Sequence, residues 1–246
     1  MSLLAQPRSA AGWIRAGLWG FYLLMWLGGV ASYVVFGGVR AGDEWAAPLF
    51  LALASVVVLA GVPPSRGLVL VLTGLLGFVA EWIGLRTGAL FSEYRYTEAL
   101  APALLDVPLV MISAWLVLVA YADELLLPLS RSRRIVAGAA LLTAIDLIID
   151  PLAAGPLGYW RWAEAGVYYG IPAHNFAGWF VVGLLAMALV QLVPARRASE
   201  HVLWTGVSIV LFFTVLAGAN TMVVPACVGG MLCVLHANVW RAAPGS

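Results

Sequence analysis

Hydrophobic residues run along this chain in long, nearly unbroken segments that are joined by short polar connections. A helix of about 20 apolar residues crosses a hydrocarbon core of about 30 Å. Eight segments approach that length, at residues 17–36, 46–62, 68–85, 105–127, 135–153, 174–193, 202–219 and 223–240. The pattern predicts an all-α, polytopic transmembrane bundle of about eight helices that forms one domain over residues 1–246. Because the Gly-Ala-Asn-Thr connection at 218–221 is so short, seven spans with one re-entrant segment is the alternative.

Composition supports the membrane interpretation and excludes several classes of partner. The chain is 63% hydrophobic and 10% charged, with a mean hydropathy of +0.98, whereas a soluble domain has about 25% charged residues. With so few charges, most of the outer surface must contact lipid. The net charge of +1 and the absence of a basic run predict no nucleic-acid partner. Cys227 and Cys233 are six residues apart in one apolar segment, which disfavours a disulfide between them.

Arginine supplies all thirteen basic residues, and its placement orients the predicted bundle. Cytoplasmic connections carry an excess of Arg and Lys. With eight spans, nine arginines fall on one side, namely Arg8, Arg15, Arg66, Arg131, Arg133, Arg134, Arg196, Arg197 and Arg241. Four fall on the other side, namely Arg40, Arg86, Arg95 and Arg161. We therefore expect a multi-pass protein of the cell membrane with both termini in the cytoplasm. The first apolar segment is too long for a signal-peptide core, so we expect it to be the first anchor.

Two connections on the predicted outer side differ from the others. Residues 86–102 and 154–173 are longer, and they mix charged residues with Tyr and Trp. An interfacial belt of aromatic residues at headgroup depth explains such loops equally well when they are taken alone. Their closeness to intramembrane acids favours a functional site.

Acidic residues inside the predicted spans are the main candidates for chemistry. A carboxylate within the membrane is energetically costly, and it is a functional hypothesis by default. Glu81 lies late in the third span, Asp106 opens the fourth, and Asp146 and Asp150 lie late in the fifth. All four fall in the outer half, which predicts a single polar pocket beside the two aromatic loops. The alternative is a set of structural ion pairs with nearby arginines, namely Arg86, Arg95 and Arg161.

Asp146 and Asp150 are four residues apart and therefore share one helix face. Two carboxylates so placed repel each other when both are ionised, so we expect one to keep its proton at neutral pH. A retained proton in an apolar pocket is what a general acid needs. Pro151 follows directly, and it predicts that the helix ends or kinks there and frees backbone groups near Asp150.

Small residues accompany Glu81 on its own helix. Thr73, Gly77, Glu81 and Gly84 fall on one stripe. Such a stripe lets a neighbouring helix, or a slender ligand, approach closely.

Histidines are few and dispersed, which excludes the membrane di-iron oxygenases that need a cluster of His ligands. His174, His201 and His236 lie in different spans, and no nucleophile elbow, phosphate loop or dinucleotide fingerprint occurs. His174 is more typical of an interfacial helix start than of a catalyst. Asn175 is predicted either to orient a water or carboxylate, or to cap the helix.

Two blocks of sequence surround these acids. The first is Glu81-Trp-Ile-Gly-Leu-Arg-Thr-Gly88 with Phe91, Tyr94, Tyr96, Leu100, Val107-Pro108 and Trp115. The second is Asp146-x3-Asp150-Pro151, Gly158-Tyr-Trp160-Arg-Trp162 and Tyr169-Gly170-Ile-Pro172-x2-Asn175-Phe176-x-Gly178-Trp179. In these blocks, which span residues 77–180, the chain resembles the CruF-type carotenoid hydratases, cofactor-independent membrane enzymes of carotenoid biosynthesis. The chain departs from their pattern at Ser92, where Gly is commoner, and at Ser113, where Pro is commoner. Asp106 has no matched position.

The resemblance implies addition of water across the terminal C1=C2 bond of an acyclic carotenoid ψ-end, of the lycopene, γ-carotene or C50 type. A protonated carboxyl would deliver a proton to the less substituted carbon, and a tertiary carbocation would form. An aromatic face can stabilise that cation, with Trp160, Trp162 and Tyr94 as candidates. A second carboxylate would deprotonate the attacking water and leave a tertiary 1-hydroxyl. No metal or redox cofactor is needed.

We expect the Asp146/Asp150 pair to supply the acid and Glu81 to position or deprotonate the water, although these roles are interchangeable at this level. The side chains expected to bind substrate are Trp160, Trp162, Tyr94, Tyr96, Arg86, Asn175, Trp179 and Asp106. The expected partners are a lipophilic carotenoid and membrane lipid, and association with a second copy or with other enzymes of the pathway is compatible with this interpretation.

Three other functions use similar features. A proton-coupled transporter also places acids in the membrane, although no internal repeat typical of secondary carriers is visible. A non-catalytic carotenoid-binding or assembly subunit would need the bundle but not the acids. A membrane lycopene cyclase shares the acid and cation chemistry and differs by forming a ring without adding oxygen.

Overall fold

The computed structural model describes residues 10–38, 42–194 and 198–242. Within these residues the chain forms eight α-helices, namely α1 (Ala10–Val30), α2 (Ala46–Ala60), α3 (Pro64–Thr87), α4 (Met111–Leu125), α5 (Arg131–Ala154), α6 (Ala173–Val190), α7 (Glu200–Ala219) and α8 (Val223–Ala242). A π-helical turn at Ala31–Val35 continues α1, and a 3-10 turn lies at Glu98–Leu100. By length and composition, α1 with its π-turn, α3, α5, α6, α7 and α8 can each cross a membrane. The predicted all-α, multi-pass bundle is confirmed.

The last two predicted spans are separate helices. α7 and α8 have 20 residues each, and both are long and apolar enough to cross a membrane. α7 and α8 are thus two distinct helices and not one span with a re-entrant segment. Within the described residues, six helices are long and apolar enough to cross a membrane, whereas α2 and α4 have only 15 residues each. Four of the arginines that were used to orient the bundle lie outside the described residues, namely Arg8, Arg40, Arg196 and Arg197.

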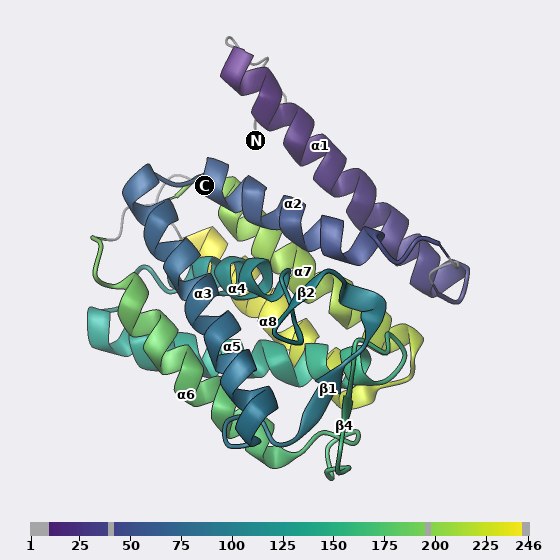
Figure 1. The fold of residues 1–246 in the computed structure, drawn as a ribbon. Coiled ribbons are helices and arrows are strands. Elements are labelled where there is room, and N and C mark those ends of the chain that lie inside the picture. Colours follow the sequence, from purple (N-terminus) through teal and green to yellow (C-terminus); the bar gives the residue numbers. More distant parts are fainter. Residues whose placement is uncertain (1–9, 39–41, 195–197, 243–246) are drawn as a thin grey trace.

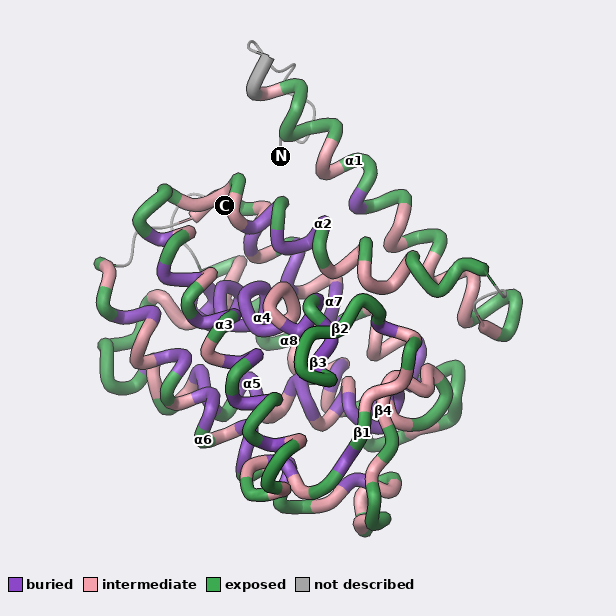
Figure 2. The backbone as a smooth tube through the Cα atoms, in the orientation of Figure 1, coloured by how far each residue is buried: buried purple, intermediate pink, exposed green. Residues whose placement is uncertain are grey.

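α4 is the central helix of the bundle. It packs against α2, α3, α5, α6 and α7, and twelve of its fifteen residues are buried. A helix that is apolar on all sides is stable only when other helices surround it. α1 contacts α2 and α7 and lies at the periphery, where most of its residues are exposed (Figures 1 and 2).

A buried charged cluster holds the helices together at the end of α4. Asp123 forms an ion pair with Arg66 of α3, lies 3.6 Å from Nε of Arg134 of α5, and accepts a hydrogen bond from Gln191. Arg66 also donates to the Val190 carbonyl at 2.7 Å. Buried charges persist in proteins only when they are paired in this way. Arg66 and Arg134 were predicted to be loop charges, but both are buried.

The two aromatic loops meet in a short antiparallel sheet, which the all-α prediction did not include. β1 (Tyr94–Tyr96) pairs with β4 (Trp160–Trp162). This sheet lies at one end of the bundle, which we call the sheet end (Figure 1).

The predicted start of the fourth span at residue 105 is wrong. A hairpin of β2 (Ala103–Leu104) and β3 (Val107–Pro108) precedes the helix, which begins at Met111. Asp106 therefore lies in the turn of this hairpin, where it is exposed, and does not open a membrane span. The segment is apolar enough to resemble a span, but it forms a hairpin in which β2 is exposed and β3 is buried.

Two glycines of the small-residue stripe on α3 receive aromatic side chains: Gly77 meets Trp115 of the neighbouring helix α4, and Gly84 meets Phe91 of the first aromatic loop. A Cβ atom added at Gly77 would lie 2.1 Å from Cγ of Trp115, a distance that no relaxed packing allows. Gly77 therefore sets how closely α3 and α4 approach each other.

We predict that Gly77→Ala destabilises the protein by about 1–3 kcal/mol, because the added methyl group overpacks the contact with Trp115. Gly67→Ala on the same helix is the matched control, since its Cβ would meet Leu59 at an ordinary 3.4 Å. Thermal unfolding of the detergent-purified variants, followed by fluorescence-detected size exclusion, measures the difference. Equal melting temperatures for the two variants would contradict this account of helix packing.

Candidate active site

The β1–β4 sheet directs four aromatic side chains toward the bundle. Successive residues of a strand point to opposite faces, and the register places Tyr94 opposite Trp162 and Tyr96 opposite Trp160. The ring centroids of these pairs are 5.1 and 5.8 Å apart. The middle residue of each strand is an arginine that is exposed. The Tyr-x-Tyr and Trp-x-Trp alternation is therefore a strand signal that could have been recognised in the sequence.

Glu81 of α3 is buried among hydrogen-bond donors. Its side chain accepts hydrogen bonds from the hydroxyls of Tyr94 and Tyr96, the latter at 3.1 Å, and from Nε1 of Trp115 at 3.3 Å. The residue is 4% exposed. None of its hydrogen-bond partners among the described residues is an arginine, so the ion-pair alternative does not describe Glu81. The contribution of Trp115 was not predicted, although Trp115 belongs to the first sequence block.

Asp146 and Asp150 share one amide. Nδ2 of Asn175 donates to Oδ2 of Asp146 at 2.8 Å and to Oδ2 of Asp150 at 2.6 Å. An amide nitrogen carries two hydrogens, so one donor serves each carboxylate. Nε1 of Trp160 donates to Oδ1 of Asp150 at 2.7 Å, and both aspartates are 1% exposed.

Asn175 orients carboxylates and does not cap its helix. The N-cap position of α6 is Pro172, and no side chain forms a cap hydrogen bond there. Two roles were expected for Asn175, and the structure shows the one in which its side chain binds carboxylates.

Pro151 frees a backbone group as expected, although α5 continues to Ala154 beyond it. Proline has no N–H, so it cannot bond the carbonyl four residues earlier. That carbonyl belongs to Leu147, and the hydroxyl of Tyr168 donates to it at 2.9 Å. The second aromatic loop is thus anchored to α5 one turn before Asp150.

Glu81 and Asp150 line one small cavity, which we call the carboxylate cavity. Its volume is about 20 Å³, which is enough for one water molecule. Its other lining residues are Phe91, Tyr94, Tyr96, Met111, Trp160, Trp162, Asn175 and Trp179. Asp146 is not among them and contacts the site through Asn175.

Arg86, Asp106 and His174 fall outside this cavity. Arg86 pairs with Asp106 at 3.1 Å, and both side chains are largely exposed. His174 is exposed and lies 2.6 Å from the Ala89 carbonyl. Trp179 does line the cavity, and its ring stacks on Trp115 with centroids 4.3 Å apart. The structure thus unites three acids with Asn175 and the aromatic residues, but not with Arg86 or Asp106.

Ser92 occupies a backbone conformation that favours glycine. Its φ is 70°, in the left-handed region, two residues before the start of β1. A residue with a Cβ is strained there, by roughly 1–2 kcal/mol. We therefore expect glycine to fit this backbone conformation better than serine.

We predict that Ser92→Gly stabilises the protein by about 1 kcal/mol, because it relieves that strain at some cost in unfolded-state entropy. Ser132→Gly, at an exposed position within α5, should instead destabilise by up to about 1 kcal/mol. Thermal unfolding of the two purified variants checks the opposite signs. A lower melting temperature for Ser92→Gly would contradict the strain argument.

The fold and the site define a multi-pass helical membrane protein with a buried carboxylate cluster that short aromatic strands cover. The carotenoid biosynthesis protein family matches residues 42–236, and the chain belongs to this family. The chain is also similar to the bisanhydrobacterioruberin hydratase of Haloarcula japonica, with 38% identity over 130 residues. That match covers 50% of this chain and 44% of the relative's length. No solved structure matches the chain.

Proposed function

We propose that the protein hydrates the terminal C1=C2 bond of an acyclic carotenoid ψ-end and so forms a tertiary 1-hydroxyl. One observation carries the proposal: Glu81 and Asp150 face a single water-sized cavity with aromatic walls. Membership of the carotenoid biosynthesis family and similarity to a protein named as a hydratase support it. No metal or redox cofactor takes part in the proposed reaction.

Asp150 is the proposed proton donor. In its acid form it transfers a proton to C2, the π electrons form the new C2–H bond, and C1 becomes a tertiary cation. Asp150 lines the cavity, whereas Asp146 lies behind it and shares its Asn175 donor. Asp146 is therefore the second member of an acid pair, and Asp150, the member that lines the cavity, is the one that reacts.

Glu81 is the proposed base. Water attacks C1 and loses a proton to the Glu81 carboxylate, so the net change is addition of one water, and that proton returns to the aspartate pair before the next turnover. Tyr94 and Tyr96 hold the carboxylate in place. Burial raises the pKa of the Tyr94 phenol well above its ordinary value, which keeps its hydroxyl a donor to Glu81.

The aromatic wall is proposed to stabilise the cation between these two steps. Trp160, Trp162, Tyr94 and Trp179 all line the cavity. The contact of a cation with an aromatic face contributes about 2 kcal/mol or more of stabilisation when the site is desolvated. A dry wall also limits competing reactions of the cation with bulk water.

We also propose that the protein resides in the cell membrane with both termini in the cytoplasm, on the basis of the arginine count. In this orientation, the sheet end and the carboxylate cavity belong to the outer half of the membrane.

Substitution of the two cavity acids tests the mechanism. In a lycopene-producing host, we predict that Asp150→Asn and Glu81→Gln each lower hydration by about 100-fold or more, since each removes one proton-transfer step. Asp146→Asn should lower it less. Glu164→Gln, at an exposed loop acid, is the control and should match the parent protein.

Mass spectrometry of the pigments provides the measurement, because hydration adds one water per reacting end. Full hydration by Asp150→Asn would overturn the acid assignment. A cyclised product without oxygen would identify a cyclase. Unchanged pigments with the parent protein would reject the hydratase proposal and favour transport or a non-catalytic binding role.

The shared amide gives an independent prediction. Asn175→Leu should lower hydration by about tenfold or more, because it leaves both buried carboxylates without their common donor. Asn220→Leu is the matched control, since the Asn220 side chain is exposed and donates to the Leu216 carbonyl at the end of α7, away from the acids. Hydration assays run beside thermal unfolding separate loss of positioning from loss of folding. Normal hydration by a folded Asn175→Leu protein would rule out this role.

A further inference from the structure

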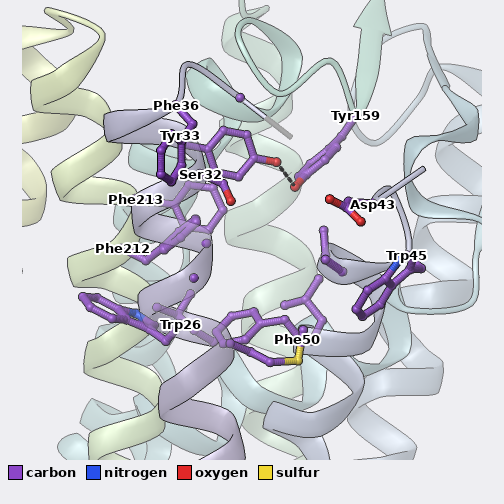
Figure 3. Close-up of a pocket in the computed structure, with 18 residues that line it drawn as sticks. Trp26, Ser32, Tyr33, Phe36, Asp43, Trp45, Phe50, Tyr159, Phe212 and Phe213 are labelled. Carbon is purple, nitrogen blue, oxygen red and sulfur yellow. Dashed lines mark hydrogen bonds between the residues drawn. The ribbon is translucent and has the colours of Figure 1, made fainter. Parts of the chain in front are cut away.

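A second and much larger cavity lies at the sheet end of the bundle, between α1, α2 and α7. Its volume is about 450 Å³, within the range of small-molecule sites. Figure 3 shows its walls, which include the rings of Trp26, Tyr33, Phe50, Tyr159 and Phe212. We call it the aromatic cavity.

One step of the backbone separates the aromatic cavity from the carboxylate cavity. Tyr159 lines the aromatic cavity, while the next residue, Trp160, lines the carboxylate cavity and bonds Asp150. The backbone of Tyr159 is fixed from both sides, by hydrogen bonds to Ala153 at 2.7 Å and from Thr97 at 2.9 Å. The two cavities are thus neighbours across the start of β4.

The aromatic cavity has one polar end and one apolar end. In Figure 3, Ser32, Tyr33 and Asp43 lie near Tyr159, and the hydroxyls of Tyr33 and Tyr159 are 3.4 Å apart. The rest of the wall is apolar. Flat aromatic rings on several sides suit a flat, conjugated chain better than a flexible lipid tail, because rings stack on rigid planar groups.

The size of the carboxylate cavity also requires a second binding region. A volume of about 20 Å³ fits a water molecule and not the body of a carotenoid. Small residues keep the larger space open: a Cβ at Gly28, on the α1 wall, would have no atom within 4 Å. α1 lies at the periphery of the bundle, so an apolar chain can reach this cavity directly from the bilayer.

We propose that the aromatic cavity binds the polyene segment of the carotenoid whose end reacts at Glu81 and Asp150, with Tyr159 at the junction between the two cavities. This inference rests on the proposed hydration. It assigns the selection of long conjugated substrates to α1, α2 and α7, outside the two sequence blocks around the acids.

Filling the cavity tests the proposal. Gly28→Trp places an indole in the open space, and Ala47→Phe fills it from the α2 wall. Gly20→Trp is the matched control, because Gly20 is on the same helix, meets nothing within 4 Å and does not line the cavity. We expect both filling variants to bind about tenfold less lycopene per purified protein, as measured by absorbance, and Gly20→Trp to bind as much as the parent protein.

Activity with two substrates completes the experiment. The filling variants should lose hydration of lycopene but keep hydration of geranylacetone, a short isoprenoid with the same (CH₃)₂C=CH– end. Unchanged lycopene binding by folded Gly28→Trp and Ala47→Phe would overturn the inference, as would mass-spectrometric detection of a phospholipid that only these variants exclude. If the parent protein binds lycopene in a cavity-dependent way but hydrates neither compound, the proposed function fails and the binding site stands.

Discussion

A carboxylate removed from water must find hydrogen-bond donors, and this requirement accounts for the structure of the sheet end. Glu81 takes donors from Tyr94, Tyr96 and Trp115, while the aspartate pair takes them from Asn175 and Trp160. These donors come from β1, β4, α4 and α6. The two aromatic loops are therefore parts of one solvation shell that replaces water around the acids.

The helices must be held in register for this shell to form. At the other end of α4, Asp123 joins α3 to α5 through arginines, and Arg66 reaches the end of α6. Along α3, Gly77 lets Trp115 approach closely enough to reach Glu81. The positions of the acidic side chains thus depend on helix contacts that lie at least one helical turn away from them.

Much of this arrangement could be predicted from the sequence. Apolar segments of membrane length predict the bundle, and the depths of Glu81, Asp146 and Asp150 along spans of assigned direction predict that the three acids share one pocket. Hydropathy could not separate the hairpin before α4 from a span, because 103–110 is apolar except for Asp106. The β1–β4 pairing joins strands of only three residues that are far apart in the chain. Asp123 was missed because an acid near a helix end resembles a loop charge.

The shared donor between the aspartates is an amide and not a cation. An arginine or lysine in the place of Asn175 would favour the ionised form of both carboxylates. An amide gives each carboxylate one hydrogen bond and adds no charge, so the number of protons held by the pair can change without loss of either contact. An uncharged hydrogen-bond donor of this kind holds a buried carboxyl group in position while that group loses and regains its proton.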